Sequence, residues 1–159
     1  MRAEALALLF AGYPALLLLF AVGCIDTGTV VNVGPSAWHR LSEIEDGAER
    51  MNELLGEHVY SVYMVESNER VDGEIVIRYH PEPFKEPHRS GQTESRPRGI
   101  VIQMGEPCRA LCIMHELGHA AGLGHSADPK NTMYKTWGRS YLTESQKRKI
   151  LEVHEGGKW

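Results

Sequence analysis

The sequence has no long run of charge of one sign and no repeated or periodic segment. Its 17 Lys and Arg stand against 21 Asp and Glu, a formal net charge of −4, so no nucleic-acid groove is expected. The 16 glycines and 8 prolines are scattered, which excludes collagen-like, repeat and low-complexity architectures. The chain has 159 residues, and 42% of them are hydrophobic, which is the composition of one ordinary globular domain.

The long apolar run lies at the N-terminus, from Ala5 to Val22. An apolar run at this place is typical of a targeting segment, so we do not count it as part of the folded domain. The residues that end it, Ala21-Val22-Gly23-Cys24, resemble the lipobox of bacterial lipoproteins, in which the signal is removed before a cysteine that receives a diacylglycerol. An uncleaved membrane anchor and an ordinary secretory signal are the alternatives. All three predict an exported protein of the cell envelope, periplasmic or at the cell surface, and we favour a lipid anchor at Cys24.

The domain boundaries follow from this segment. Residues 1–23 form the signal or anchor, residues 24–35 hold the lipidated cysteine, a short linker and a first strand, and residues 36–159 complete one domain. With Cys24 acylated, Cys108 and Cys112 remain as an even pair in an oxidising compartment, where a disulfide is possible. Two reduced core cysteines, or a metal-binding pair, are the alternatives.

Hydrophobic periodicity predicts the elements of the mature chain. Residues 29–33 predict a short strand, and apolar residues at helical spacing predict a helix over 36–55 that stops at Gly56. Residues 59–65 and 73–79 predict two strands arranged like a hairpin. Further along we expect, in order, a long surface loop over 81–97, a strand over 99–104, a buried helix over 108–123 and a last helix that Thr143 and Gln146 open with a capping box.

A metal-binding pattern lies on the predicted buried helix. His115 and His119 are one turn apart and project from one face, so both imidazoles can reach one tetrahedral Zn²⁺. Glu116 lies about 100° round the helix. There its carboxylate stays free of the metal and can accept a proton from a metal-activated water. Gly122 can adopt a positive φ that ends the helix, and His125 then supplies a third nitrogen.

These residues form the pattern H-E-x-x-H-x-x-G-x-x-H, and the chain resembles the metzincin family of zinc proteases. Met133 stands where metzincins place the Met-turn that forms a hydrophobic floor beneath the metal, and Ser126, directly after the third histidine, favours the matrixin-like branch. The resemblance implies an α+β zincin fold. Its parts are a twisted, mostly parallel sheet with an antiparallel edge strand, a long first helix, the active-site helix, the Met-turn and a C-terminal helix.

The resemblance also implies a function. We expect a zinc-dependent metalloendopeptidase that uses one catalytic Zn²⁺, with Glu116 as general base, to hydrolyse peptide or protein substrates. It is expected to be a membrane-tethered monomer. Structural Ca²⁺ and a second Zn²⁺ are not expected, because residues 81–97 lack the matrixin ligand pattern and His80 and His88 are typical solvated histidines. The alternative is a zinc-binding envelope lipoprotein that acts as a binding or interaction module without proteolysis.

Two segments are candidates for contact with the substrate. The first is the strand segment Ile100, Val101 and Ile102, which would pair with an extended peptide if it forms an open edge, and which is otherwise ordinary sheet core. The second is implied by the resemblance, which places Tyr134, Lys135 and Trp137 at the pocket for the side chain after the scissile bond. For Trp137, packing on the core is the alternative. Lys135 replaces a proline that is frequent in matrixins, so this pocket wall is expected to differ.

Overall fold

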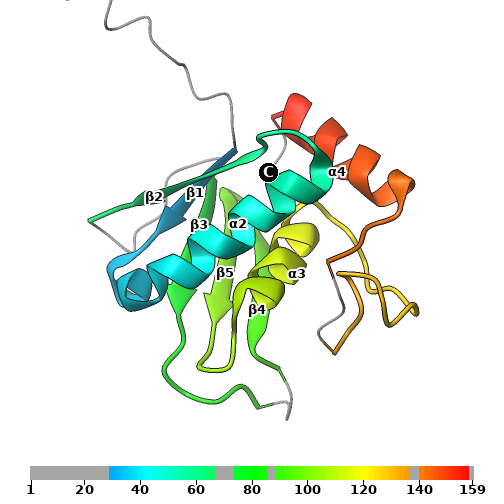
Figure 1. The fold of residues 1–159 in the computed structure, drawn as a ribbon. Coiled ribbons are helices and arrows are strands. Elements are labelled where there is room, and N and C mark those ends of the chain that lie inside the picture. The colour runs from blue at the N-terminus through cyan, green and yellow to red at the C-terminus, as the bar shows by residue number, and fades with distance from the viewer. Residues whose placement is uncertain (1–28, 67–73, 86–88, 137–139, 158–159) are drawn as a thin grey trace, which may run out of the picture.

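The computed structural model describes residues 29–66, 74–85, 89–136 and 140–157, which form an α+β fold (Figure 1). The signal or anchor predicted over 1–23, the lipid site Cys24, His88 and Trp137 lie outside these residues. No helix within the described ranges has the length and apolar character needed to cross a membrane.

One twisted sheet of five strands forms the first layer, in the order β2-β1-β3-β5-β4 (Figure 1). Its strands are β1 (Thr29–Val33), β2 (Tyr60–Met64), β3 (Glu74–Tyr79), β4 (Gly91–Arg96) and β5 (Gly99–Met104). Strands β1, β2, β3 and β5 run parallel to one another, and β4 runs antiparallel to β5 at the edge. The predicted mostly parallel sheet with an antiparallel edge strand is therefore confirmed.

The predicted hairpin is wrong. β2 and β3 are not neighbours, because β1 lies between them and pairs in parallel with both. The surface loop predicted over 81–97 is also corrected, since it contains β4, which turns at Pro97 and Arg98 and returns along β5. An edge strand has a neighbour on only one side and can carry polar residues, which conceals it in the sequence.

The predicted edge role of Ile100, Val101 and Ile102 is wrong as well. They lie on β5, which is hydrogen-bonded to β3 on one side and to β4 on the other. All three are buried, so they form sheet core and have no free edge to offer a peptide. The open edge on this side of the sheet belongs to β4.

The helices form the second layer. They are the 3₁₀ helix η1 (Pro35–Arg40), α2 (Leu41–Leu55), α3 (Ala110–Ala120) and α4 (Glu144–Glu155). Figure 1 shows α2 and α3 side by side against the sheet, with α4 across its upper end. As predicted, α2 ends at Gly56, which adopts φ 77°, and Thr143 with Gln146 forms a capping box at α4. The helix expected from residue 36 begins instead with the 3₁₀ turn.

The core fills the space between the two layers. Apolar residues of β1, β3 and β5 point toward apolar residues of α2 and α3, among them Val31, Ile75, Ile102, Met51, Ile113 and Leu117, all fully buried. This packing fixes α3 against the sheet, so the side chains that α3 presents on its other faces have defined positions.

Helices α2 and α3 approach each other closely at Gly47. A Cβ at this position would lie 2.6 Å from Cβ of Ile113 and 2.9 Å from the backbone oxygen of Ala110. We expect Gly47→Ala to lower the free energy of unfolding by about 1 kcal/mol, because overpacking costs more than the helix propensity of alanine contributes. Denaturant titration measures this change. Gly124→Ala, where no atom lies within 4 Å, is the matched control, and an unchanged midpoint for Gly47→Ala would contradict the close approach.

Candidate active site

Three histidines from α3 and the chain that follows it converge on one point. Nε2 of His119 lies 3.0 Å from Nε2 of His115 and 3.2 Å from Nε2 of His125. Two nitrogens on a tetrahedral Zn²⁺ lie about 3.4 Å apart for Zn–N bonds of about 2.1 Å. Within the described part of the chain, these residues form a group able to hold a metal, with all ligand atoms within 4.8 Å of one another.

Backbone carbonyls hold the other nitrogen of two of these rings. Nδ1 of His115 lies 2.8 Å from the carbonyl oxygen of Thr132, and Nδ1 of His119 lies 2.8 Å from that of Leu123. When Nδ1 donates its proton to a carbonyl, Nε2 is left with a free lone pair, which is the tautomer a metal requires. The donor set therefore fits one Zn²⁺ ion.

The electrostatics of the histidines favour the same form. Burial lowers the pKa of His115 to about 4, against the opposite effect of its hydrogen bond to Thr132. Burial also lowers the pKa of His125, and the neighbouring His119 and Lys135 add to this shift. Neutral imidazole is the form that binds metal, so these two ligands are prepared for it at neutral pH.

The turn after α3 brings the third histidine back to the site. Gly122 adopts φ 73°, a left-handed conformation that L side chains rarely reach, and the helix ends there as predicted. Nζ of Lys149, on α4, donates to the carbonyl of Gly122 and ties the turn to the last helix. The chain then reverses and presents His125 toward α3.

Met133, the predicted Met-turn residue, lies against α3, the helix that carries His115 and His119. Its side chain is fully buried and packs so closely on Gly118 that a Cβ there would overlap Sδ of Met133. The amide of Met133 donates to the side chain of Asn131, and its carbonyl accepts from the amide of Ser126. The segment after His125 is thus held by hydrogen bonds within itself, one of which uses the Asn131 side chain.

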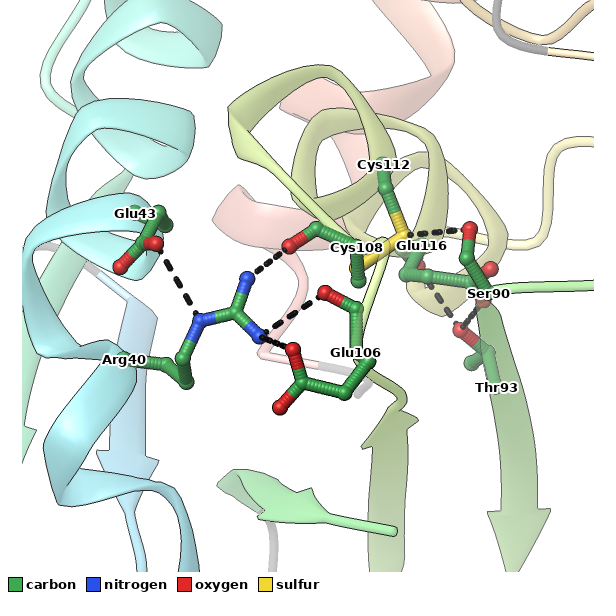
Figure 2. The surroundings of a disulfide bond; sticks show 8 residues. All are labelled: Arg40, Glu43, Ser90, Thr93, Glu106, Cys108, Cys112 and Glu116. Atoms are coloured by element: carbon green, nitrogen blue, oxygen red, sulfur yellow. Dashed lines mark hydrogen bonds and ion pairs between the residues drawn. A yellow bond between two sulfur atoms is a disulfide. The ribbon is translucent and has the colours of Figure 1, made fainter. Parts of the chain in front are cut away.

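Glu116 lies beside the histidines and faces β4. The Thr93 hydroxyl on β4 donates to Oε2 of Glu116 at 2.6 Å and lies 3.0 Å from its backbone oxygen (Figure 2). Burial raises the pKa of Glu116 to about 6, although the hydrogen bond from Thr93 opposes that rise. A carboxyl group with a pKa near the working pH is suited to accept and return a proton.

A cleft of about 640 Å³ opens over these groups. Its walls are β4, the face of α3 that carries Glu116 and His119, and the chain after the Met-turn, represented by Ser90, Thr93, Glu116, His119, His125 and Lys135. Lys135 thus lines the cleft as predicted. Tyr134 is half-buried, bridges to Ser126 and is not among the lining residues, and Trp137 lies outside the described residues.

The two cysteines next to the cleft form a disulfide. In the structure Cys108 and Cys112 are bonded, with their Cα atoms 5.3 Å apart, the arrangement of the disulfide alternative. Cys108 lies before the first residue of α3 rather than on the helix, where the sequence had placed both. The Ser90 hydroxyl lies 3.4 Å from Sγ of Cys112. Figure 2 shows the disulfide at the start of α3, beside Ser90.

A buried arginine holds the segment that leads into α3. The guanidinium of Arg40 donates to the backbone oxygens of Glu106 and Cys108, and its Nε lies 3.2 Å from Oε1 of Glu43 (Figure 2). Only 6% of Arg40 is exposed. Neither Arg40 nor Thr93 carries a local sequence signal, because each acts on residues far away in the chain.

His80, for which no ligand role was expected, does not join the site. His80 stacks on Phe84, with ring centroids 4.8 Å apart, and its Nδ1 lies 2.6 Å from the backbone oxygen of Glu82. It lies apart from the group formed by His115, His119 and His125.

Comparisons with known proteins agree with this site. Residues 106–154, from the turn before α3 into α4, match the model of the family Matrixin. The fold is similar to that of archaemetzincin from Methanopyrus kandleri, with a TM-score of 0.56 and 15% identity over 84% of this chain and 99% of that chain.

It is also similar to metalloproteinase-II from Bacteroides fragilis, with a TM-score of 0.51 and 14% identity over 79% of this chain. This chain covers 52%, about half, of that protein's length. No curated protein matches the sequence. The segment that carries the three histidines therefore matches the matrixins, and the chain as a whole has a metzincin-like zinc metallopeptidase fold.

Proposed function

We propose that this protein is a zinc-dependent endopeptidase. The observation that carries the proposal is the convergence of three histidine Nε2 atoms beside the Glu116 carboxylate, in a cleft walled by an open strand edge. A site that only holds a metal needs no carboxylate next to the ligands. The position of Glu116 therefore favours hydrolysis over the alternative, a zinc-binding module without proteolysis.

Each group in the cleft has a part in peptide-bond hydrolysis. His115, His119 and His125 would hold Zn²⁺, which would supply Lewis-acid chemistry for the scissile carbonyl and the attacking water. Glu116 accepts a proton from the attacking water at its carboxylate and returns it to the leaving amine. Met133 is fully buried against Gly118 of α3 and supplies an apolar packing surface behind the helix that carries Glu116.

Strand β4 is the surface that we expect to bind the peptide. Among the described residues it pairs with β5 on one side only, so the other edge has no strand neighbour there and its backbone N–H and C=O groups can pair with a peptide. An extended peptide that adds to this edge would lie along the cleft with its backbone beside Glu116. A bond within the peptide, rather than at its end, would then reach the histidines, which supports an endopeptidase.

Removal of the metal is expected to abolish cleavage. Treatment of the purified protein with a chelator should reduce hydrolysis of a quenched peptide library to the background rate, because the Lewis acid is lost. Stoichiometric Zn²⁺ should restore the rate, whereas Mg²⁺ should not, since it prefers six oxygen ligands. Cleavage that persists in the metal-free protein would contradict the proposal.

We further propose that the protein is exported and tethered by lipid at Cys24. The disulfide between Cys108 and Cys112 supports an oxidising compartment, because such bonds are rare in the cytosol. In a bacterial host fed labelled palmitate, the full-length chain is expected to take up label and fractionate with membranes. Cys24→Ser should lose the label. Label retained by this variant would refute lipidation, and membrane attachment without label in the wild type would indicate a transmembrane anchor instead.

A further inference from the structure

Strand β4 presents two chemically different faces. Side chains alternate along a strand, and Gly91, Thr93 and Ser95 share one face of β4 and line the cleft beside α3, where Gln92 also reaches the lining. On the alternate positions, Gln92 donates to Glu94 at 3.2 Å, and Glu94 pairs with Arg96. The ionic pairs of β4 thus involve the alternate positions, while the set beside α3 has only small side chains and hydroxyls.

This small-residue face contacts the Glu116 carboxylate at both oxygens. The Thr93 hydroxyl lies 2.6 Å from Oε2. At the other oxygen the strand backbone comes so close that a Cβ on Gly91 would lie 2.7 Å from Oε1 and 2.9 Å from Cγ. The side chain of Glu116 is therefore confined between α3, which carries it, and β4, which faces it.

The hydrogen bond from Thr93 fixes the rotation of the Glu116 carboxylate, which close packing alone does not determine. Gly91 limits how far the carboxylate can move, but only a donor selects one rotation of the carboxylate about its last bond. The hydroxyl has a single proton, and the shorter contact directs it to the carboxylate rather than to the Glu116 carbonyl at 3.0 Å. A base must be held within a fraction of an ångström of its productive position for efficient proton transfer.

We propose that Thr93 is a positioning residue, whose hydroxyl holds the Glu116 carboxylate in the orientation that accepts the proton of the attacking water. The inference rests on the proposed endopeptidase function. It assigns to β4 a role in the chemical step that is separate from pairing with the substrate. Removal of the hydroxyl should therefore lower kcat, whereas KM, which reports peptide binding along β4, should change little.

The test uses the full-length, zinc-loaded chain and one quenched peptide that the wild type cleaves. Thr93→Val removes the hydroxyl at nearly constant volume, Thr93→Ala removes it without branching, and Thr93→Ser retains it. We expect Val and Ala each to lower kcat roughly tenfold or more, with KM within about twofold of the wild type and one zinc per chain. Ser should recover most of kcat.

Three results would overturn the inference. The first is a kcat for Val or Ala equal to that of the wild type. The second is a Ser variant as slow as Ala, which would assign the effect to the methyl group. The third is a loss confined to KM or to zinc content. If Val fails to fold, as judged by its unfolding midpoint, the comparison of Ala with Ser decides. A wild type that binds zinc and cleaves no peptide would instead refute the proposed function, and the inference with it.

Discussion

Glu116→Gln is expected to bind zinc and lose most of its hydrolytic rate. Glutamine has almost the same shape and can still accept the hydrogen bond from Thr93, but it cannot take a proton from water. General acid-base catalysis contributes about 10²–10⁴-fold, so kcat should fall by roughly this factor. The three histidines are untouched, and zinc content measured by metal analysis should remain one per chain.

A matched control separates the base from the general effect of removing a carboxylate. Glu57 is an exposed residue after α2, away from the residues that line the cleft. Glu57→Gln should therefore cleave at the wild-type rate. If Glu116→Gln keeps more than about a tenth of the wild-type kcat, Glu116 is not the general base, and another group must accept the proton.

Arg40→Met is expected to lower the free energy of unfolding by about 3 kcal/mol, the largest effect on stability that we predict. Met retains much of the apolar stem of arginine but donates no hydrogen bond. The backbone oxygens of Glu106 and Cys108 would lose the donors that satisfy them in a buried setting. Glu43 would keep a partner, since Nη1 of Arg109 lies 3.0 Å from its Oε1.

Arg50→Met is the matched control. Arg50 also pairs with an acidic residue, with its Nε 2.7 Å from Oδ1 of Asp46, but both side chains are about half exposed, at 48% and 47%. An exposed pair contributes about 0.2–1 kcal/mol, so this variant should unfold close to the wild type in denaturant. Equal midpoints for the two variants would show that the burial of Arg40 contributes nothing to stability.

Local geometry explains which parts of the fold and site were predictable. On any helix, the spacing of His115 and His119 places both side chains on one face with Glu116 beside them, independently of the tertiary structure. The helix end at Gly122 and the helix start at the capping box of Thr143 are likewise predicted from a few neighbouring residues. The convergence of the three histidines could therefore be predicted from the sequence.

Strand order did not follow, because it depends on residues far apart in the chain. The strands over 59–65 and 73–79 were found, but nothing local shows that β1 inserts between them. The run Ile100, Val101 and Ile102 did carry a usable signal. A continuous apolar run is typical of a strand covered on both faces, which argues for a central position and against the edge role first assigned to it.

Thr93 was not predicted as a functional residue, because its strand β4 was predicted as part of a surface loop. The sequence of β4, between two prolines and rich in charge, satisfies the pattern of a loop as well as that of an edge strand. Thr93 can bond to Glu116 only because β4 lies against α3. Arg40 can bond to the Cys108 carbonyl only because η1 lies against the turn before that helix.

Cleavage of peptides with both ends blocked tests the central claim most directly. The zinc-loaded protein would be incubated with a mixed library of N-acetylated, C-amidated peptides, and the products identified by mass spectrometry. We predict cuts at internal bonds, each absent after chelation and in Glu116→Gln. One zinc per chain with every peptide intact would contradict an endopeptidase and favour the zinc-binding module.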